Sequence, residues 1–447
     1  MKLIYDVKDK PKFGQLIVFA IQQLLAIMAA TLVVPVIIGN GMSPAAALFG
    51  AGMGTLVYLL FTKFRSPVFL GSSFAFLGSM SAAFAGAVST AAGFAGLIIG
   101  AIFAGLVYVV IAIIVKIAGV NWINKLMPAV VIGPTVAIIG LSLAGNAVGD
   151  LQKGGVGTAH PLICVLVGLV TLVIVILCAT YGKKMTRLIP FILGILGGYA
   201  VAAIFTVIGN VAGIDALKVI DFSHITNLWA NGVNVNTFLT LPGFSFVEAF
   251  KGIKDIDGAY IATLAVAYLP VAFVVFAEHI ADHKNISSII ETDLLEDPGL
   301  SRTLLGDGVG SMVGAFFGGC PNTTYGESVG CVAITGNASV YTIITAAVLA
   351  MLIAFIAPFV AFVNSIPSCV MGGVCMALYG FIAVSGLKMV QKVDLNQNKN
   401  LFVVSTILIA GIGGLTLNFG KITITAVACA LILGIIVNLI VSKAKEQ

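Results

Sequence analysis

The sequence predicts an all-α polytopic membrane protein with about fourteen transmembrane segments in two inverted repeats of seven. Three observations lead to this fold class. Of the 447 residues, 60% are hydrophobic and only 9% are charged, whereas soluble domains carry roughly 25% charged residues. Apolar runs of about 20 residues, the length that crosses a bilayer, recur along the whole chain. Two stretches of the first half also match two stretches of the second half in the same order.

Fourteen apolar segments can be placed along the chain. The polar N-terminus is too long for a cleavable signal peptide, so we expect the first segment to act as the insertion signal. The polar stretch 211–258 separates a first repeat, 1–210, from a second repeat, 259–447. The predicted segments are 14–38, 44–61, 68–82, 90–118, 127–146, 160–180, 187–210, 260–283, 303–318, 321–335, 340–359, 367–387, 400–417 and 422–442.

The internal repeat is visible in two pairs of segments. LFGAGMGTLVYLLF (48–61) aligns without gaps with LLGDGVGSMVGAFF (304–317), and six of the fourteen positions are identical. MPAVVIGP (127–134) aligns in the same way with IPSCVMGG (366–373). The matched segments are seven spans apart. Because an odd offset reverses the orientation, the two halves are predicted to form an inverted repeat.

The repeat also relates the residues around these pairs. Its first offset, 304 − 48 = 256, places Gln22 on Glu278. It further suggests that SPVFLGSSFAFLG (66–78) is the partner of CPNTTYGESVG (320–330), because both combine Pro and Gly with small polar residues. Interrupted segments at corresponding positions of two halves indicate a binding site near the middle of the membrane.

Basic residues are distributed unequally between the two sides of this topology. If the N-terminus is cytoplasmic, 18 of the 23 Lys and Arg residues fall on the cytoplasmic side, and the other five are Lys153, Lys218, Lys251, Lys254 and Lys421. The positive-inside rule then places both termini in the cytoplasm of a cytoplasmic-membrane protein, and 211–258 outside. Since the charges are spread over many short loops, no nucleic-acid-binding face is predicted. The seven cysteines show neither metal-ligand nor disulfide spacing.

The stretch Leu304–Gly336 interrupts the apolar pattern inside the predicted membrane. A glycine-rich run leads into Pro321, and Tyr325, Gly326 and Glu327 follow before the apolar pattern resumes. Backbone that leaves regular helix at this depth is buried in protein or lines a cavity. An ionisable residue there indicates a functional site. The alternative is a polar loop that joins two spans at the surface.

Four of the 18 acidic residues lie inside apolar segments: Glu278, Asp282, Asp307 and Glu327. An ionised carboxylate at the bilayer centre costs at least about 2.5 kcal/mol, so we expect these residues to have a function. Glu278 and Asp282 share a helix face because they are four residues apart. Two neighbouring acids in a poorly hydrated site resist double ionisation, so one should hold a proton at neutral pH. Asp282 could instead be a solvated residue at the end of its span.

The residues beside these acids have simpler interpretations. His279 points about a quarter turn away from Glu278 and is expected to be packed and neutral. His283 is expected at the aqueous boundary. Asp307 opens its span, and acids are favoured at a helix N-terminus.

A substrate site is predicted where the two broken segments meet. Gly326 lets a backbone N–H come close to a ligand, and Tyr325 offers a ring and a hydroxyl. Ser72, Ser73 and Phe74 of the third segment should face them. Exposed N–H groups at half-helix ends donate to carbonyl oxygens.

Carboxylates complete this pattern as acceptors. Glu278 and Glu327 can accept ring N–H groups, while the backbone at Phe74 and Gly326 donates. This combination fits a small planar heterocycle with alternating C=O and N–H groups, on which Phe74 or Tyr325 could pack. Neither HExxH, nor a Walker A motif, nor a plausible Ser/His/Asp order is present, so the sequence does not predict an enzyme. No cofactor or metal is predicted.

At these residues the chain resembles the nucleobase–ascorbate transporter family, the nucleobase–cation symporters, and within it most of all the bacterial uracil-carrying branch. The resemblance covers essentially the whole chain. It is specific at LGSSFAF (70–76), FAEHIADH (276–283), DLLEDPGLSRTLLGDG (293–308) and PNTTYGESVGCVAITG (321–336).

The resemblance implies more than the residues alone. It implies a core domain from spans 1–4 and 8–11, a gate domain from spans 5–7 and 12–14, and a short extended strand in spans 3 and 10. It implies that Glu278 and Glu327 accept the ring N–H groups of uracil, that the backbone at Phe74 and Gly326 meets its carbonyls, and that Tyr325 lines the pocket. It also implies proton symport involving Glu278, Asp282 and Glu327, and often a homodimer.

The chain departs from the family pattern at three points. Asp282 stands where uracil carriers have a second His, Gln22-Gln23 replaces a Gln-His pair, and Ser328 follows the site acid where Asn is usual. The first departure leaves the details of proton coupling open. The alternatives are a purine or xanthine symporter and an anion carrier or channel on the same fold. Midplane carboxylates argue against the anion carrier because they repel anions.

Overall fold

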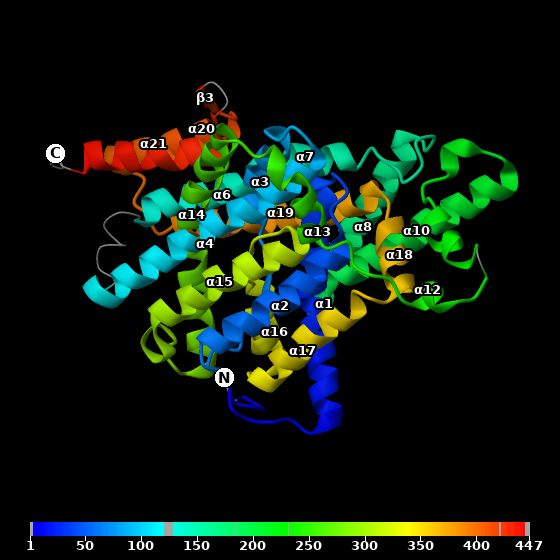
Figure 1. The fold of residues 1–447 in the computed structure, drawn as a ribbon, viewed down its shortest axis with the longest axis horizontal. Coiled ribbons are helices and arrows are strands. Elements are labelled where there is room, and N and C mark those ends of the chain that lie inside the picture. The colour runs from blue at the N-terminus through cyan, green and yellow to red at the C-terminus, as the bar shows by residue number, and fades with distance from the viewer. Residues whose placement is uncertain (1–2, 120–127, 184, 231, 420–421, 443–447) are drawn as a thin grey trace.

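A computed structural model of the chain describes residues 3–119, 128–183, 185–230, 232–419 and 422–442 (Figure 1). Met127, where the fifth predicted segment begins, lies outside these residues. So do six of the basic residues in the charge count: Lys2, Lys125, Lys184, Lys421, Lys443 and Lys445.

The elements of the first half and of the connecting stretch are mostly helices. They are α1 (Phe13–Ile38), α2 (Pro44–Phe61), β1 (Leu70–Ser72), η1 (Phe74–Phe76), α3 (Leu77–Ala85), α4 (Thr90–Ala118), α6 (Ala129–Ser142), α7 (Ala144–Asp150), α8 (Pro161–Tyr181), α9 (Met185–Leu188), α10 (Pro190–Ala212), η2 (Asp215–Leu217), α11 (Ser223–Thr226), η3 (Asn227–Trp229), α12 (Val235–Phe238), α13 (Ser245–Gly252) and η4 (Ile253–Asp255).

The second half has the same character. Its elements are α14 (Gly258–Ile290), η5 (Leu295–Gly299), α15 (Leu300–Gly318), β2 (Asn322–Thr324), α16 (Gly326–Thr335), α17 (Val340–Ile353), α18 (Ala357–Ser365), α19 (Ser368–Val390), α20 (Asn398–Ile412), β3 (Leu417–Phe419), β4 (Ile422–Ile424) and α21 (Ala426–Val441).

Helices account for the predicted segments. Most segments coincide with one helix. The fifth corresponds to α6 and α7, the seventh begins in α9 and continues as α10, and the eleventh runs from α17 into α18. The third, tenth and fourteenth each begin with a strand, and the thirteenth ends at one. Among the described residues, eight helices are long and apolar enough to cross a membrane, and α17, α20 and α21 are shorter apolar helices. The protein is therefore an all-helical membrane protein.

Several of these helices begin at capping side chains. The hydroxyl of Ser43 accepts from the backbone N–H of Ala46 at the start of α2, and Ser89 and Asp257 do the same for α4 and α14. Such residues satisfy backbone donors that the first helical turn leaves unpaired.

Glycines bring α2 and α15 into close contact. A Cβ added to Gly54 would lie 2.6 Å from the carbonyl oxygen of Gly310, and one added to Gly310 would lie 2.7 Å from that of Gly54. Away from this point, Gly50 meets Gly314 and Gly306 meets Tyr58. The helices are thus antiparallel, as small residues allow in membrane interiors.

These contacts have the symmetry that an inverted repeat requires. The offset of 256 found in the sequence turns Gly50 into Gly306 and Tyr58 into Gly314, so each contact becomes the other when the halves are exchanged. The pair Gly54–Gly310 is exchanged with itself. A twofold pseudo-symmetry axis therefore passes through this pair.

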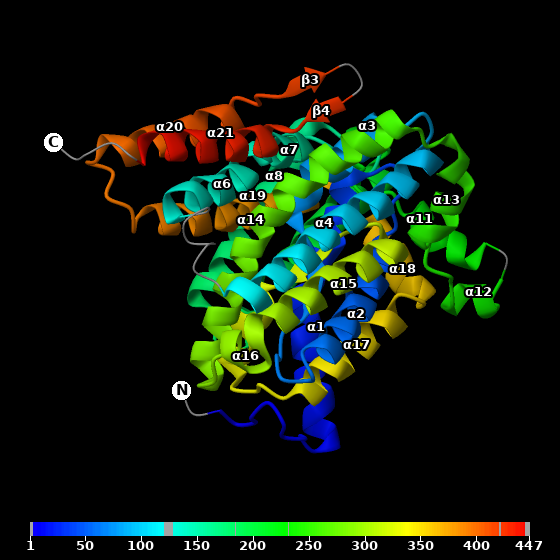
Figure 2. The same ribbon diagram turned by 60° about the vertical axis from the view of Figure 1, so that its left-hand side comes forward.

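The second matched pair of segments behaves in the same way. Gly386 on α19 meets the carbonyl oxygen of Gly133 on α6, and Gly372 on α19 meets that of Ala147 on α7. The offset of 239 between these segments (366 − 127) turns Gly133 into Gly372 and Ala147 into Gly386. Figure 2 shows α20 and α21 beside α6 and α19, apart from the group around α2 and α15.

The two strands meet at the centre of the repeat. β1 and β2 pair antiparallel, with Leu70 opposite Thr324, Gly71 opposite Thr323 and Ser72 opposite Asn322. All six residues are buried. The short strands expected in spans 3 and 10 are therefore present, and each leads directly into a helix that starts inside the protein.

Two predicted positions are wrong. His283 was expected at the aqueous boundary, but α14 continues to Ile290 and the side chain is fully buried. Asp307 was expected to open its helix, but α15 begins at Leu300 and Asp307 is fully buried two turns inside it. In both cases the polar residues flanking the apolar run are part of the helix because other helices cover them.

Candidate functional site

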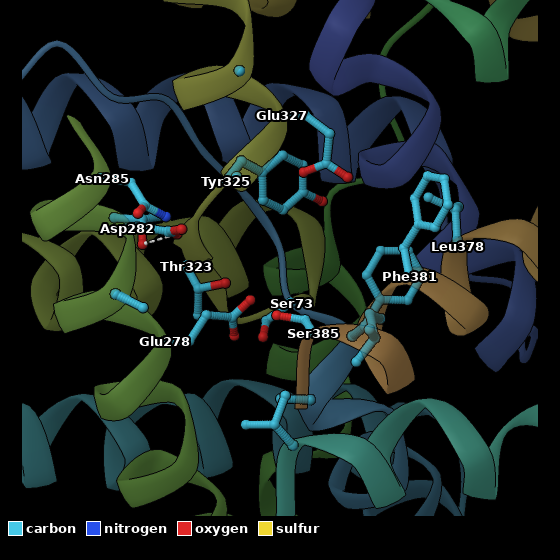
Figure 3. Close-up of a pocket in the computed structure, with 18 of the residues that line it drawn as sticks. Ser73, Glu278, Asp282, Asn285, Thr323, Tyr325, Glu327, Leu378, Phe381 and Ser385 are labelled. Atoms are coloured by element: carbon cyan, nitrogen blue, oxygen red, sulfur yellow. Dashed lines mark hydrogen bonds between the residues drawn. The ribbon is translucent and has the colours of Figure 1, made fainter. Parts of the chain in front are cut away.

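A cavity of about 470 Å³ lies between the two groups of helices. One wall comes from α14, the end of β2 and the start of α16, and the opposite wall comes from α19 and α10. Figure 3 shows the side chains of both walls directed into the same space. A volume of this size is typical of a small-molecule site.

Glu278 and Glu327, the two acids predicted to accept ring N–H groups, both line this cavity. Glu278 is carried by α14, and Glu327 is the second residue of α16. Figure 3 shows them on different sides of the space, with Thr323, Tyr325 and Ser73 around them. The start of α16 adds backbone N–H groups that have no partner within the helix, so acceptors and donors occur side by side.

Tyr325 and Gly326 also line the cavity, at the point where strand becomes helix. The Tyr325 ring packs on the backbone of β1, because a Cβ at Gly71 would lie only 2.3 Å from it. The Tyr325 hydroxyl donates to the carbonyl oxygen of Ser72 at 2.7 Å. Tyr325 therefore holds the end of β2 against β1 and also forms part of the cavity wall.

Of the three residues predicted in the third segment, two line the cavity and one does not. Ser73 and Phe74 line the cavity. Ser72 is fully buried and is not among the lining residues, because alternate residues of a strand point to opposite sides. The Phe74 ring lies edge-on to Tyr379 of α19, with centroids 6.1 Å apart.

Asp282 belongs to the cavity wall and is not a solvated helix end. Its side chain is 8% exposed, and its Oδ2 accepts from the Thr324 hydroxyl at 2.9 Å. A Cβ at Gly326 would lie 3.8 Å from its Oδ1. The carboxylate thus joins α14 to the junction of β2 and α16.

The start of α16 is fastened by a buried hydrogen-bond pair. Ser328 Oγ accepts from the side-chain amide of Gln23 on α1 and from the backbone N–H of Phe69, the latter at 2.9 Å. Gln22, which the repeat aligned with Glu278, does not line the cavity. The neighbouring Gln23 therefore supports the site from α1, and Ala26 of the same helix lines the cavity.

His279 is packed, as expected, in a buried cluster beside the cavity. Its Nδ1 lies 2.6 Å from Asp307 Oδ2 and its Nε2 lies 3.0 Å from the Thr303 hydroxyl. The rings of His279 and His283 are stacked, with centroids 3.9 Å apart. Asp307 is thus the partner of a histidine, which its position in the sequence did not indicate.

Several lining residues were not predicted. Phe381 and Ser385 lie on the wall opposite the acids, and Val136, Arg187 and Asn285 also line the cavity. They lie in ordinary apolar segments or at their ends, without a motif that marks them. Thr323 was within reach of the sequence analysis, since it belongs to the quoted run PNTTYGE. Among the described residues, no group of three or more His, Cys, Asp or Glu could hold a metal ion.

Comparison with known proteins identifies the family. A model of a permease family, described as "Permease family", matches residues 14–420. The chain belongs to this family. It is therefore a membrane transporter and not an enzyme, and the family resemblance stated from the sequence is confirmed.

Curated relatives of this permease cover nearly its whole length. It is 38% identical over 442 residues to the uracil permease of Bacillus caldolyticus, covering 98% of this chain and 95% of that protein. It is 37% identical to the uracil permease of Bacillus subtilis, covering 100% and 97%. It is 34% identical to the uracil permease of Escherichia coli, covering 97% and 93%.

Solved structures show a similar fold at low sequence identity. The transmembrane domain of the cyanobacterial bicarbonate transporter BicA has a TM-score of 0.61 at 13% identity, covering 97% of the permease and 99% of that chain. The murine anion transporter Slc26a9 in its inward-facing state has a TM-score of 0.66 at 10% identity, covering 97% and 69%. The permease therefore shares the fold of these transporters.

Proposed function

We propose that this permease imports uracil together with protons across the cytoplasmic membrane by alternating access. The observation that carries the proposal is the meeting of Glu278, Glu327 and the start of α16 in one cavity. The names of the curated relatives support uracil as the substrate.

Recognition follows from complementary hydrogen bonding. Uracil presents two ring N–H groups and two carbonyl oxygens around a flat ring. Glu278 and Glu327 accept the N–H groups, and backbone N–H groups at Phe74 and Gly326 donate to the carbonyls. Hydrogen bonds to charged groups contribute about 1.5–3 kcal/mol each, which makes the two glutamates the main determinants of affinity.

Transport requires that the cavity opens alternately to either side. We assign spans 1–4 and 8–11 to a core domain that carries the acids and the broken helices. Spans 5–7 and 12–14 form a gate domain that supplies Phe381 and Ser385. With fourteen spans in two inverted sevens and both termini cytoplasmic, the core moves against the gate around the bound substrate.

Protons enter the cycle through the cavity acids. Glu278, Asp282 and Glu327 line one cavity, and neighbouring carboxylates in a poorly hydrated site resist simultaneous ionisation. A proton bound with the substrate reduces this repulsion and is released where the pH is higher. An inside-alkaline gradient should therefore raise uracil accumulation, and an inside-acidic gradient should lower it.

Two other substrates are weighed against uracil. A purine or xanthine would use the same donors and acceptors on a larger ring system. An anion is favoured only by the fold, since BicA and Slc26a9 are anion transporters. The carboxylates in the cavity oppose an anion. We also expect a homodimer in the bilayer, as the resemblance implies.

A competition assay in proteoliposomes tests the proposal. Uptake of radiolabelled uracil is measured with an imposed pH gradient and challenged with unlabelled uracil, xanthine, hypoxanthine or sulfate. We expect competition by uracil alone. Stronger competition by xanthine would move the assignment to purines, and uptake unaffected by the pH gradient would refute proton coupling.

A further inference from the structure

The stretch of chain before α1 lies against the C-terminal end of α16, and Figure 2 shows it in dark blue beside the yellow connection to α17. We propose that residues 3–9, the N-terminal strap, are a positioning element of the substrate site. The strap ties the C-terminal end of α16 to α1 and thereby sets the direction of Glu327 and of the N–H groups at the start of α16. The inference rests on the proposed recognition of uracil by these groups.

Backbone hydrogen bonds join the strap to the end of α16. Gly336 ends this helix in a left-handed backbone conformation. Its carbonyl oxygen accepts from the N–H groups of Ile4 and Tyr5, at 2.7 and 3.3 Å. The carbonyl oxygen of Tyr5 in turn accepts from the N–H of Ala338 at 2.9 Å. Tyr5 and Asn337 thus pair in a parallel β-bridge at the point where the helix stops.

The strap also supplies partners at the start of α17. Val340 is the first residue of that helix, and Ser339 before it makes no capping side-chain hydrogen bond. The carbonyl oxygen of Val7 accepts from the N–H of Val340 at 3.0 Å, and the Ser339 hydroxyl donates to the carbonyl oxygen of Asp9. The turn 337–339 is buried. The strap therefore satisfies backbone groups that the end of one helix and the start of the next leave unpaired.

Tyr5 connects this turn to α1. Its ring lies edge-on to that of Phe19, with centroids 6.1 Å apart. Its hydroxyl donates to Oε1 of Gln15 at 2.6 Å. Both partners belong to α1, so one strap residue is paired with the end of α16 through its backbone and with α1 through its side chain.

The same helix holds the other end of α16. The amide of Gln23 on α1 donates to Ser328 Oγ in the first turn of α16. Eight residues separate Gln15 from Gln23 (23 − 15), and eight separate Ser328 from Gly336 (336 − 328). Eight residues of helix rise about 12 Å, so the two connections are spaced equally on both helices. α1 therefore supports α16 at both of its ends.

The strap matters to the site because α16 is a short half-helix. Without the strap, α16 keeps its connection at Ser328 and its packing on α1, but the chain alone holds its C-terminal end. The helix can then tilt and turn about Ser328. Such a movement redirects the neighbouring Glu327 side chain and the N–H groups at the helix start, and hydrogen bonds weaken steeply when their direction is wrong.

The side chains of the strap alternate between the protein and the solvent, as in an extended strand. Tyr5 and Val7 are half-buried, whereas Ile4 and Lys8 are exposed. Tyr5→Ala therefore removes the link to α1 and leaves the backbone pairing in place. Lys8→Ala is the matched control, because its side chain extends outward from the same segment.

Hydrogen–deuterium exchange in detergent tests the connection without any ligand. The native protein is compared with a variant that lacks residues 2–9, with Tyr5→Ala and with Lys8→Ala. The amides of 326–340 should exchange faster in the deletion variant and, to a smaller degree, in Tyr5→Ala, because a helix end that is not held opens more often. Those of α19, on the opposite wall of the cavity, should keep native exchange throughout. Lys8→Ala should match the native protein.

Uracil binding tests the consequence for the site. The deletion should weaken binding about tenfold, because a misdirected Glu327 forfeits about one charged hydrogen bond. The decisive measurement is Glu327→Gln in both backgrounds. In the deletion variant its effect on affinity should be about tenfold smaller than in the full chain, because a hydrogen bond that is already lost is not lost again. A strap that only stabilised the fold would leave the effect of Glu327→Gln unchanged.

Three results would overturn the inference: native exchange of 326–340 in the deletion variant, native uracil affinity of that variant, or an undiminished effect of Glu327→Gln. If the deletion variant does not fold, Tyr5→Ala takes its place in each comparison, and the same three results count against the inference. Failure of the native protein to bind uracil would refute the proposed function. The exchange experiment would still decide whether the strap holds α16.

Discussion

At the scale of the residue, the proposed substrate site depends on two carboxylates that line the same cavity as the start of α16. Glu327 is the more direct of the two, because it belongs to the half-helix whose N–H groups lie beside it. A glutamine at this position would present an amide group in place of a second oxygen. It would keep the shape of the side chain and lose the charge.

We predict that Glu327→Gln abolishes uracil uptake while the protein stays folded. The lost charged hydrogen bond corresponds to about 1.5–3 kcal/mol, or roughly 10- to 150-fold in affinity. Binding calorimetry and proteoliposome uptake measure the two effects. Glu248→Gln is the control, since Glu248 lies on α13 in an exposed ion pair with Lys251. Normal uptake by Glu327→Gln would exclude a role for its charge.

A second residue-scale prediction concerns Ser328. Ser328→Ala leaves the buried Gln23 amide and the Phe69 N–H without their shared acceptor, which costs about 1–3 kcal/mol each when unpaired. We expect a lower thermal unfolding midpoint in detergent and weaker uracil binding. Ser405→Ala, at an exposed position of α20, should leave both unchanged. An unaltered midpoint in Ser328→Ala would show that the two hydrogen bonds accepted by Ser328 are not needed for stability.

The sequence identified the acids of the site but not the positions of the buried residues beside them, and the reason is physical. Charges are rare in apolar segments, so Glu278, Asp282 and Glu327 stood out. His283 and Asp307 were assigned to span ends, because hydropathy marks where apolar residues stop and not where a helix ends. Phe381 could not be predicted as a wall residue, since an aromatic facing a cavity reads like one facing lipid.

At the scale of the element, the close contact of α2 and α15 holds the broken segments in register. Gly54 lies at their crossing, and the added methyl group of Gly54→Ala would lie 2.6 Å from the Gly310 carbonyl oxygen. We expect a loss of about 1–3 kcal/mol in stability, as overpacking usually costs. A lower denaturation midpoint would report it.

The matched control for this prediction is Gly78→Ala. Gly78 lies in α3, and nothing lies within 4 Å of an added Cβ there. This substitution should be neutral or slightly stabilising, because alanine is less flexible than glycine in the unfolded chain. If both variants unfolded at the same midpoint, the contact between the helices would not depend on the absence of a side chain.

Most elements followed from the sequence, and the exceptions are informative. The crossing of α2 and α15 was not predicted, although the glycines that form it are identical positions of the repeat. The hairpin of β3 and β4, paired antiparallel between α20 and α21, was missed. Its residues continue the apolar composition of the neighbouring spans, so only pairing in space distinguishes strand from helix there.

At the scale of the whole molecule, the cavity lies between two groups of helices that we propose to move against each other. Asn285 on α14 and Met389 on α19 line it from opposite groups. We predict that a cleavable cross-linker between cysteines at these positions stops uracil uptake and that reduction restores it. A cross-link between two positions of α14 should have no effect. Continued uptake in the cross-linked state would show that these walls do not separate during transport.

The inverted repeat was predicted from the sequence, and the contacts between α2 and α15 locate its symmetry axis. Sequence offsets of 256 and 239 related the halves, and the exchange of paired contacts across Gly54–Gly310 gives that relation an axis. The strands fit an offset of 252 instead, since Leu70 would correspond to Asn322. A single alignment offset could not relate both the helices and the strands. The first half has four more residues between the helix crossing at Gly54 and strand β1 than the second half has between Gly310 and β2.

The size of the cavity has a pharmacological consequence. At about 470 Å³, it holds a single six-membered ring with much room to spare. A pyrimidine that carries a bulky substituent could dock its ring edge on the glutamates while the substituent props the two walls apart. We expect such a compound to inhibit without being carried, and elongated uracil analogues are therefore a rational starting point for blockers.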